Sequence, residues 1–87
     1  MLSIKVRLFA LYRERLKTSE LTLMVRAGST VQDLVDQLAQ EHPNVGHLLE
    51  HTAIAVNEVY AENSQILTKG DEVALLPPVS GGSFQTA

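Results

Sequence analysis

Two stretches of alternating apolar and polar residues, followed by one long amphipathic segment, limit this chain to a small set of folds. In residues 3–10 the apolar positions of one side are Ile4, Val6 and Leu8. Residues 20–26 alternate in the same way. Successive side chains of a strand point to opposite faces of a sheet, so each stretch predicts a strand with one buried face. Both strands then need another element to cover that face.

Residues 30–42 supply this cover, because they have the period of an amphipathic helix. The apolar side follows the i, i+3, i+4, i+7 spacing, with Val31, Leu34, Val35 and Leu38. Thr30 is the expected N-cap, and Asp33 three residues later completes a capping box. Pro43 cannot continue a helix, so the segment is expected to end at the residue before it.

Shorter segments complete the expected order of elements. Residues 10–16 form a helical turn with Leu11 and Leu16 as its apolar positions, and residues 45–50 form a second short helix. Three strands follow the helices, at residues 54–57, 59–60 and 72–76, and the residues that plug the core between the last two are Ile66 and Leu67. This order predicts an α+β fold, with a mixed β-sheet packed on one main helix and the last strand parallel to the first. It is the β-grasp order of ubiquitin.

The composition of the chain excludes several classes of function. With 87 residues the chain is expected to form one domain, and the absence of cysteine excludes disulfides and thiolate chemistry. The net charge of −3 argues against nucleic-acid binding, and without a signal peptide or an apolar run long enough to span a membrane, a cytoplasmic location is expected. His47 and His51 are spaced i, i+4, but too few further ligands accompany them, so no metal site is expected.

The segment after the last expected strand has no pattern of a strand, a helix or a pocket. Pro77 and Pro78 fix the backbone, and Val79 and Ser80 lead to the glycine pair Gly81-Gly82. A tail that is stiff first and free of side chains afterwards is suited to entering a narrow active site of another protein. Residues 83–87 follow, so Gly82 is not the end of the chain.

Four segments resemble the MoaD/ThiS sulfur-carrier family, whose members are ubiquitin-like β-grasp proteins. They are residues 9–14 (FALYRE), residues 30–34 (TVQDL), the pair Val56-Asn57 and residues 70–82 (GDEVALLPPVSGG). The last of these is the specific one. Within the family, the chain is most similar to the small subunit of molybdopterin synthase.

This resemblance implies a carrier that takes part in molybdenum cofactor biosynthesis without catalytic residues of its own. An ATP-dependent activating enzyme adenylates the carboxylate of the terminal glycine, here Gly82, which then becomes a thiocarboxylate. The large subunit of the synthase docks the carrier, and the sulfur goes to a pterin precursor to build the dithiolene of molybdopterin. The carrier binds no cofactor itself, since ATP is used by the activating enzyme. The expected partner-binding residues are Phe9, Arg13, Tyr60 and Leu76. By alternation Val73 and Leu75 face the core, so Leu76 points outward, as Phe9 does in the first strand.

The extension departs from the family pattern, because Gly82 is in a peptide bond to Ser83 and an amide cannot be adenylated as an acid can. We therefore expect a sulfur-carrier domain over residues 1–82 and a short extension, 83–87, that a processing protease removes. Two alternatives stay open. The chain could be a carrier of another pathway (thiamine or cysteine) or a ubiquitin-like protein modifier, or it could be a non-catalytic β-grasp binding module.

Overall fold

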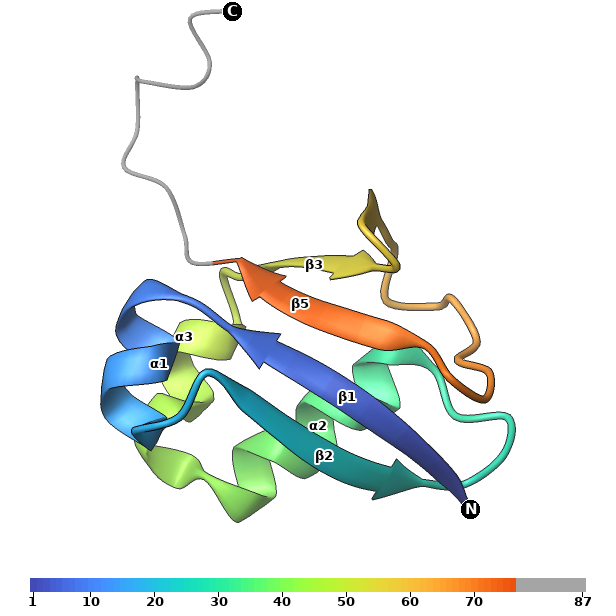
Figure 1. Ribbon diagram of the computed structural model, residues 1–87, viewed down its shortest axis with the longest axis horizontal. Coiled ribbons are helices and arrows are strands. Elements are labelled where there is room, and N and C mark those ends of the chain that lie inside the picture. The colour runs from blue at the N-terminus through green and yellow to red at the C-terminus, as the bar shows by residue number, and fades with distance from the viewer. Residues whose placement is uncertain (77–87) are drawn as a thin grey trace, which may run out of the picture.

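Nine elements build the fold in the computed structural model, which describes residues 1–76 (Figure 1). The strands are β1 (Leu2–Leu8), β2 (Glu20–Val25), β3 (Ala53–Val56), β4 (Val59–Tyr60) and β5 (Glu72–Leu76). The helices are α1 (Ala10–Leu16), α2 (Val31–Glu41), the 3-10 turn η1 (Pro43–Val45) and α3 (Gly46–Leu49).

The five strands form one mixed sheet in the order β2-β1-β5-β3-β4. The first strand, β1, pairs antiparallel with β2 and parallel with β5, while β3 pairs antiparallel with both β5 and β4. The long helix α2 lies across one face of this sheet (Figure 1). The structure thus confirms the predicted α+β, β-grasp fold and the parallel placement of the first and last strands.

The core lies between the sheet and α2. Eight of its fully buried side chains come from the predicted faces of both: Ile4, Val6, Leu8, Val31, Leu34, Leu38, Val73 and Leu75. The capping box of α2 is present, with Thr30 Oγ1 accepting from the Asp33 N–H at 3.2 Å and Asp33 Oδ2 accepting from the Thr30 N–H at 3.0 Å. The two sequence signals that defined this helix therefore hold at the level of individual atoms.

The corner between β1 and α1 differs from the prediction. The strand ends at Leu8 rather than at residue 10, and Phe9 is the N-cap of α1. The inward residue of α1 is Tyr12, which is fully buried, whereas Leu11 is 40% exposed. The helix contacts η1, and the residues by which it packs against the core are Tyr12 and Leu16, so Leu16 has its predicted role and Leu11 does not.

The loop before β5 brings a second correction. Leu67 is buried as predicted, but Ile66 is 57% exposed. Ile66 pairs with Thr30 in an isolated antiparallel bridge, and Leu67 donates its N–H to Ser29 O at 2.8 Å. The loop is therefore extended here, and neighbouring side chains of an extended segment point to opposite sides. One residue of the pair can enter the core, and the other faces outward.

Candidate partner-binding site

The sheet has a second face, opposite α2, which we call the open face. Leu8, Leu75 and Ile54 lie side by side in register and point into the core, so the residues one step along each strand point the other way. The resulting row across the open face runs from β1 to β4 and consists of Arg7, Ala74, Ala55 and Tyr60. Its two central residues are alanines, of which Ala74 is half-buried and Ala55 is buried.

Phe9 and Leu76 lie at one end of this face. Leu8 is paired with Leu75 in the parallel register, and Phe9 and Leu76 are the next residues of the two chains. Phe9 keeps extended backbone angles (φ −129°, ψ 157°), so the alternation continues through it and brings its ring to the open face. Its side chain is 37% exposed, and Leu76 is half-buried beside Ala53. Apolar side chains gathered in this way are typical of protein interfaces.

Arg7 is held in a fixed position next to this end. Its Nη1 donates to Glu72 Oε2 at 3.2 Å, and its guanidinium carbon lies 5.7 Å from the centre of the Phe9 ring. With Glu58 and Ala74 these residues border a shallow hollow of about 200 Å³. Half-exposed ion pairs contribute little to stability, on the order of 0.2–1 kcal/mol. The pair therefore acts mainly by orienting a positive charge on the open face.

The other two predicted partner-binding residues lie apart. Tyr60 is 73% exposed on β4, at the edge of the sheet, and Arg13 is exposed on α1, off the sheet. The tail residues Pro77, Pro78, Val79, Ser80, Gly81 and Gly82 lie outside the described residues. The structure thus brings Phe9 and Leu76 together, places Tyr60 in the same face and puts Arg13 on α1, outside the sheet.

Sequence reasoning missed Arg7, Ala55 and Ala74 on the open face. Each has the outward parity of its strand, which was available from the alternation. An alanine at an outward, half-buried position of a strand, as at Ala74, leaves that part of the surface free of bulk. The alternation within one strand does not predict the register between strands, and it is this register that places Ala74 between Arg7 and Ala55.

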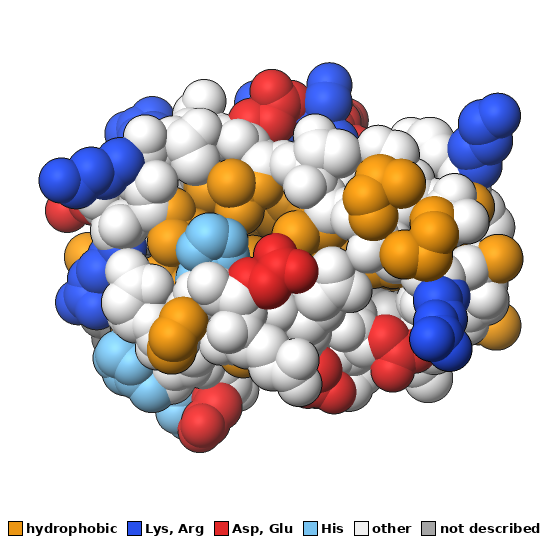
Figure 2. Space-filling view, turned by 90° about the horizontal axis from the view of Figure 1, so that it is seen from below, with side chains coloured by type: hydrophobic (Ala, Val, Ile, Leu, Met, Phe, Trp, Pro, Cys, Tyr) orange, Lys and Arg blue, Asp and Glu red, His pale blue; other side chains and the backbone are white. Residues whose placement is uncertain are grey.

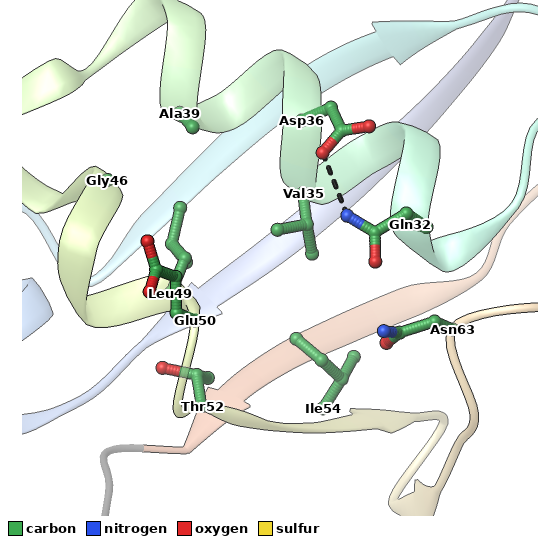
Figure 3. Close-up of a pocket in the computed structure, with 10 residues that line it drawn as sticks. All are labelled: Gln32, Val35, Asp36, Ala39, Gly46, Leu49, Glu50, Thr52, Ile54 and Asn63. Atoms are coloured by element: carbon green, nitrogen blue, oxygen red, sulfur yellow. Dashed lines mark hydrogen bonds between the residues drawn. The ribbon is translucent and has the colours of Figure 1, made fainter.

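A second hollow, of about 430 Å³, lies on the helix side between α2, α3 and β3 (Figure 3). Val35, Leu49 and Ile54 form its apolar part, and Gln32 Nε2 donates to Asp36 Oδ1 at 2.8 Å on its rim. Figure 2 shows the molecule from below, with hydrophobic side chains in a hollow bordered by a histidine and acidic side chains, and with basic side chains mostly toward the outline.

Residues 1–76 hold neither a cluster of metal ligands nor a membrane-spanning helix. Within them, no three His, Asp or Glu side chains gather as metal ligands do. In the same part of the chain, none of the helices combines the length and hydrophobicity that a membrane crossing requires. Within the described fold, the open face with Phe9 and Leu76 at one end is the candidate site.

Comparison with known proteins agrees with this geometry. The "Molybdopterin synthase sulfur carrier subunit" of Arabidopsis thaliana is 40% identical over 79 residues, which cover 91% of this chain and 82% of that protein. Among solved structures, small archaeal modifier protein 1 (SAMP1) of Haloferax volcanii has a TM-score of 0.80 at 31% identity, covering 92% of this chain and 99% of that one.

A chain in the complex of subunits 1 and 2 of the molybdopterin-converting factor from Helicobacter pylori has a TM-score of 0.67 at 27% identity, covering 93% of this chain and 100% of that one. Residues 6–82 match the ThiS family. The fold, the open face and a match that extends over nearly the whole chain lead to one assignment: the protein belongs to the ThiS/MoaD family of ubiquitin-like sulfur carriers.

Proposed function

We propose that this chain is the sulfur-carrier subunit of a molybdopterin synthase and that Gly82 carries the sulfur. The observation that supports this most directly is where the family match ends. It runs through residues 6–82 and stops at the second glycine of the pair, so residues 83–87 lie beyond it. The relative from Arabidopsis thaliana, 40% identical, is named as a carrier of this enzyme.

The chemistry needs a free carboxylate on Gly82. After a protease removes residues 83–87, a carboxylate oxygen of Gly82 attacks the α-phosphorus of ATP held by an activating enzyme, and pyrophosphate leaves. A sulfide-level donor then attacks the acyl carbon and AMP leaves, which gives the thiocarboxylate. The carrier contributes the acyl group and the docking surface and is not itself catalytic.

The described residues would serve docking. The open face presents Phe9 and Leu76 at the end where the chain continues into the tail, with Ala55 and Ala74 beside them. A large subunit seated there would lie next to the start of Pro77–Gly82. Glycine has no side chain, so Gly81-Gly82 can pass through a channel that excludes other residues. A complex between two subunits of the molybdopterin-converting factor is the subject of the related Helicobacter pylori structure, which supports this arrangement.

The test compares the full chain with a form truncated after Gly82. Five extra residues displace the terminal carboxylate by up to ~16–18 Å along an extended chain, and Phe84 would have to enter a channel fitted to glycine. Each form is incubated with the cognate activating enzyme, ATP and a sulfur donor, and its intact mass is measured. We expect thiocarboxylate only on the truncated form.

A form truncated after Gly81 is the matched control, since it keeps the fold and loses only the terminal glycine. It should gain sulfur poorly or not at all. Equal inertness of the full and the Gly82-terminated forms, with an enzyme that is active on another carrier, would contradict the proposal and favour a binding module.

A second candidate, a protein modifier, is favoured by the similarity to small archaeal modifier protein 1. It shares the adenylate step and differs in the nucleophile, because a lysine amine of a target protein would attack the acyl carbon in place of sulfide. The two are separated by supplying the activated form with the large subunit or with a cell extract. Sulfur transfer supports the carrier, and isopeptide-linked products support the modifier.

A further inference from the structure

A chain of hydrogen bonds lies beneath the corner that carries Phe9. The Tyr12 hydroxyl pairs with Thr52 Oγ1, and the Thr52 hydroxyl donates to Leu48 O at 2.8 Å. Because the Thr52 hydrogen is used on Leu48, the Tyr12 O–H is the donor to Thr52. Tyr12 is fully buried, and Thr52 is half-buried at the rim of the hollow shown in Figure 3.

The two hydroxyls lie next to different parts of the candidate site: Tyr12 is next to Phe9, and Thr52 is next to the pairing of Ala53 with Leu76. Tyr12 follows Phe9 by three residues, and its N–H donates to Phe9 O at 3.1 Å. Thr52 directly precedes Ala53, which pairs with Leu76, the last described residue. One side-chain contact, between residues forty positions apart in the sequence, therefore links the Phe9 corner to the strand end from which the tail continues.

Packing alone does not require these hydroxyls. A phenylalanine would fill the space of the Tyr12 ring, and a valine would fill that of Thr52. Burial raises the pKa of the Tyr12 phenol, and the bond to Thr52 opposes that shift in part. Burying a hydroxyl without a hydrogen-bond partner lowers the stability of the fold. The Tyr12–Thr52 pair avoids this loss, and its hydrogen bond fixes the relative position of the two side chains in addition to filling space.

We propose that Tyr12 and Thr52 are positioning residues, which hold the Phe9 corner and the Ala53–Leu76 strand end in a fixed relation so that the open face and the origin of the tail are preformed for docking. This inference rests on the proposed function. Rigid partners bind more tightly because less conformational freedom is lost on association. In this proposal both residues act through Phe9 and Leu76 and take no part in the reaction of the carboxylate.

Three variants test the pair. Tyr12→Phe and Thr52→Val keep the volume and remove a hydroxyl, while Thr52→Ser keeps the hydroxyl. In forms ending at Gly82, calorimetry with the molybdopterin synthase large subunit should show affinity about two- to tenfold lower for the first two, the range that one hydrogen bond accounts for. Thr52→Ser should bind as the unchanged sequence does.

Thr30→Ala is the matched control for stability. It removes a hydroxyl bonded in the capping box of α2, and α2 begins near the opposite end of the sheet from the end of β5 (Figure 1). It should lower the stability of the fold and leave the affinity unchanged. If Thr30→Ala weakens binding as much as Tyr12→Phe does, or if Tyr12→Phe and Thr52→Val bind as tightly as the unchanged sequence, the inference is wrong.

Amide hydrogen exchange on the isolated full chain decides the same question without a partner. Residues 53–54 and 75–76 should exchange faster in Tyr12→Phe and Thr52→Val than in Thr52→Ser or Thr30→Ala. Unchanged exchange at these amides would overturn the inference. If the unchanged sequence fails to bind the large subunit, the proposed function fails, while the exchange data still show whether the pair holds the strand end.

Discussion

At the scale of single residues, Asp71 shows how one carboxylate joins two parts of the sheet. Its Oδ2 accepts from the Thr68 N–H at 2.8 Å, and its Oδ1 accepts from Asn57 Nδ2 at 2.9 Å. Asn57 Oδ1 accepts in turn from the Glu72 N–H at 3.0 Å. Asn57 and Glu58 both have positive φ (52° and 72°), as a two-residue hairpin turn requires. The side chain of Asp71 thereby fixes the β3–β4 turn against the start of β5.

These contacts predict a dependence of stability on acid. The backbone N–H of Thr68 lowers the pKa of Asp71, burial opposes this, and the Asn57 amide lowers the pKa further. A carboxyl whose pKa is lower in the folded state stabilises the fold above its unfolded pKa of about 3.9, and this stabilisation is lost as the pH falls through the folded pKa. Urea denaturation at neutral pH and near pH 3 should therefore show a smaller loss for Asp71→Ala than for the unchanged sequence. Equal losses would contradict the role of Asp71.

At the scale of elements, α2 separates the contributions of a cap and of a core side chain. Leu34→Ala removes a fully buried side chain and should lower the free energy of unfolding by about 2–5 kcal/mol. Thr30→Ala removes one capping hydrogen bond and should cost about 1 kcal/mol. Chemical denaturation measures both. A loss for Thr30→Ala as large as that for Leu34→Ala would mean that the capping box does more than end the helix.

The edge strand β2 is partly closed to other strands. Gln37 Nε2, on α2, donates to Met24 O at 3.0 Å, and Thr18 Oγ1 donates to Glu20 O at 3.0 Å. Both carbonyls belong to a strand at the end of the sheet order, where free backbone groups can pair with another chain. Side chains occupy these acceptors, which favours binding of partners on the open face rather than along this edge.

The elements also show which features of the fold can be predicted from sequence patterns. Alternation located the inward faces of β1, β2 and β5, and the 3.6-residue period with its cap located α2, because these signals depend on neighbours in the sequence. Tyr12 was missed as the buried residue of α1, since its partner Thr52 comes from a distant segment. Ile66 was misplaced because its bridge to Thr30 makes the loop extended.

The candidate site was predictable to the same degree. The alternation of the first and last strands predicts that Phe9 and Leu76 point outward. The structure adds that these residues lie at the ends of two neighbouring strands. The central alanines, Ala55 and Ala74, depend on the register between strands, which no single segment encodes. The partner-binding roles of all these residues stay predictions.

At the scale of the whole molecule, the docking proposal depends on one end of the open face. Leu76→Glu places a charge beside Phe9 and, once a partner covers it, leaves that charge without water, so the affinity for the large subunit should fall by about tenfold or more. Calorimetry measures this. Met24→Glu is the matched control, because Met24 is 48% exposed on β2, at the far end of the sheet from β3 and β4, and receives the same charge. Equal affinities for the two variants would remove Leu76 from the docking surface.

The parallel pairing of β1 with β5 has a consequence for folding kinetics. It joins Lys5 to Glu72, so the sheet cannot close until segments far apart in the sequence meet, whereas β1 and β2 are joined by a short connection. Distant pairings form at the expense of loop entropy and slow the search for the native state. We expect β5 to dock late, so Val73→Ala should mainly raise the unfolding rate, and Ile4→Ala should mainly lower the folding rate. Stopped-flow chevrons of the two variants would show which strand sets the barrier.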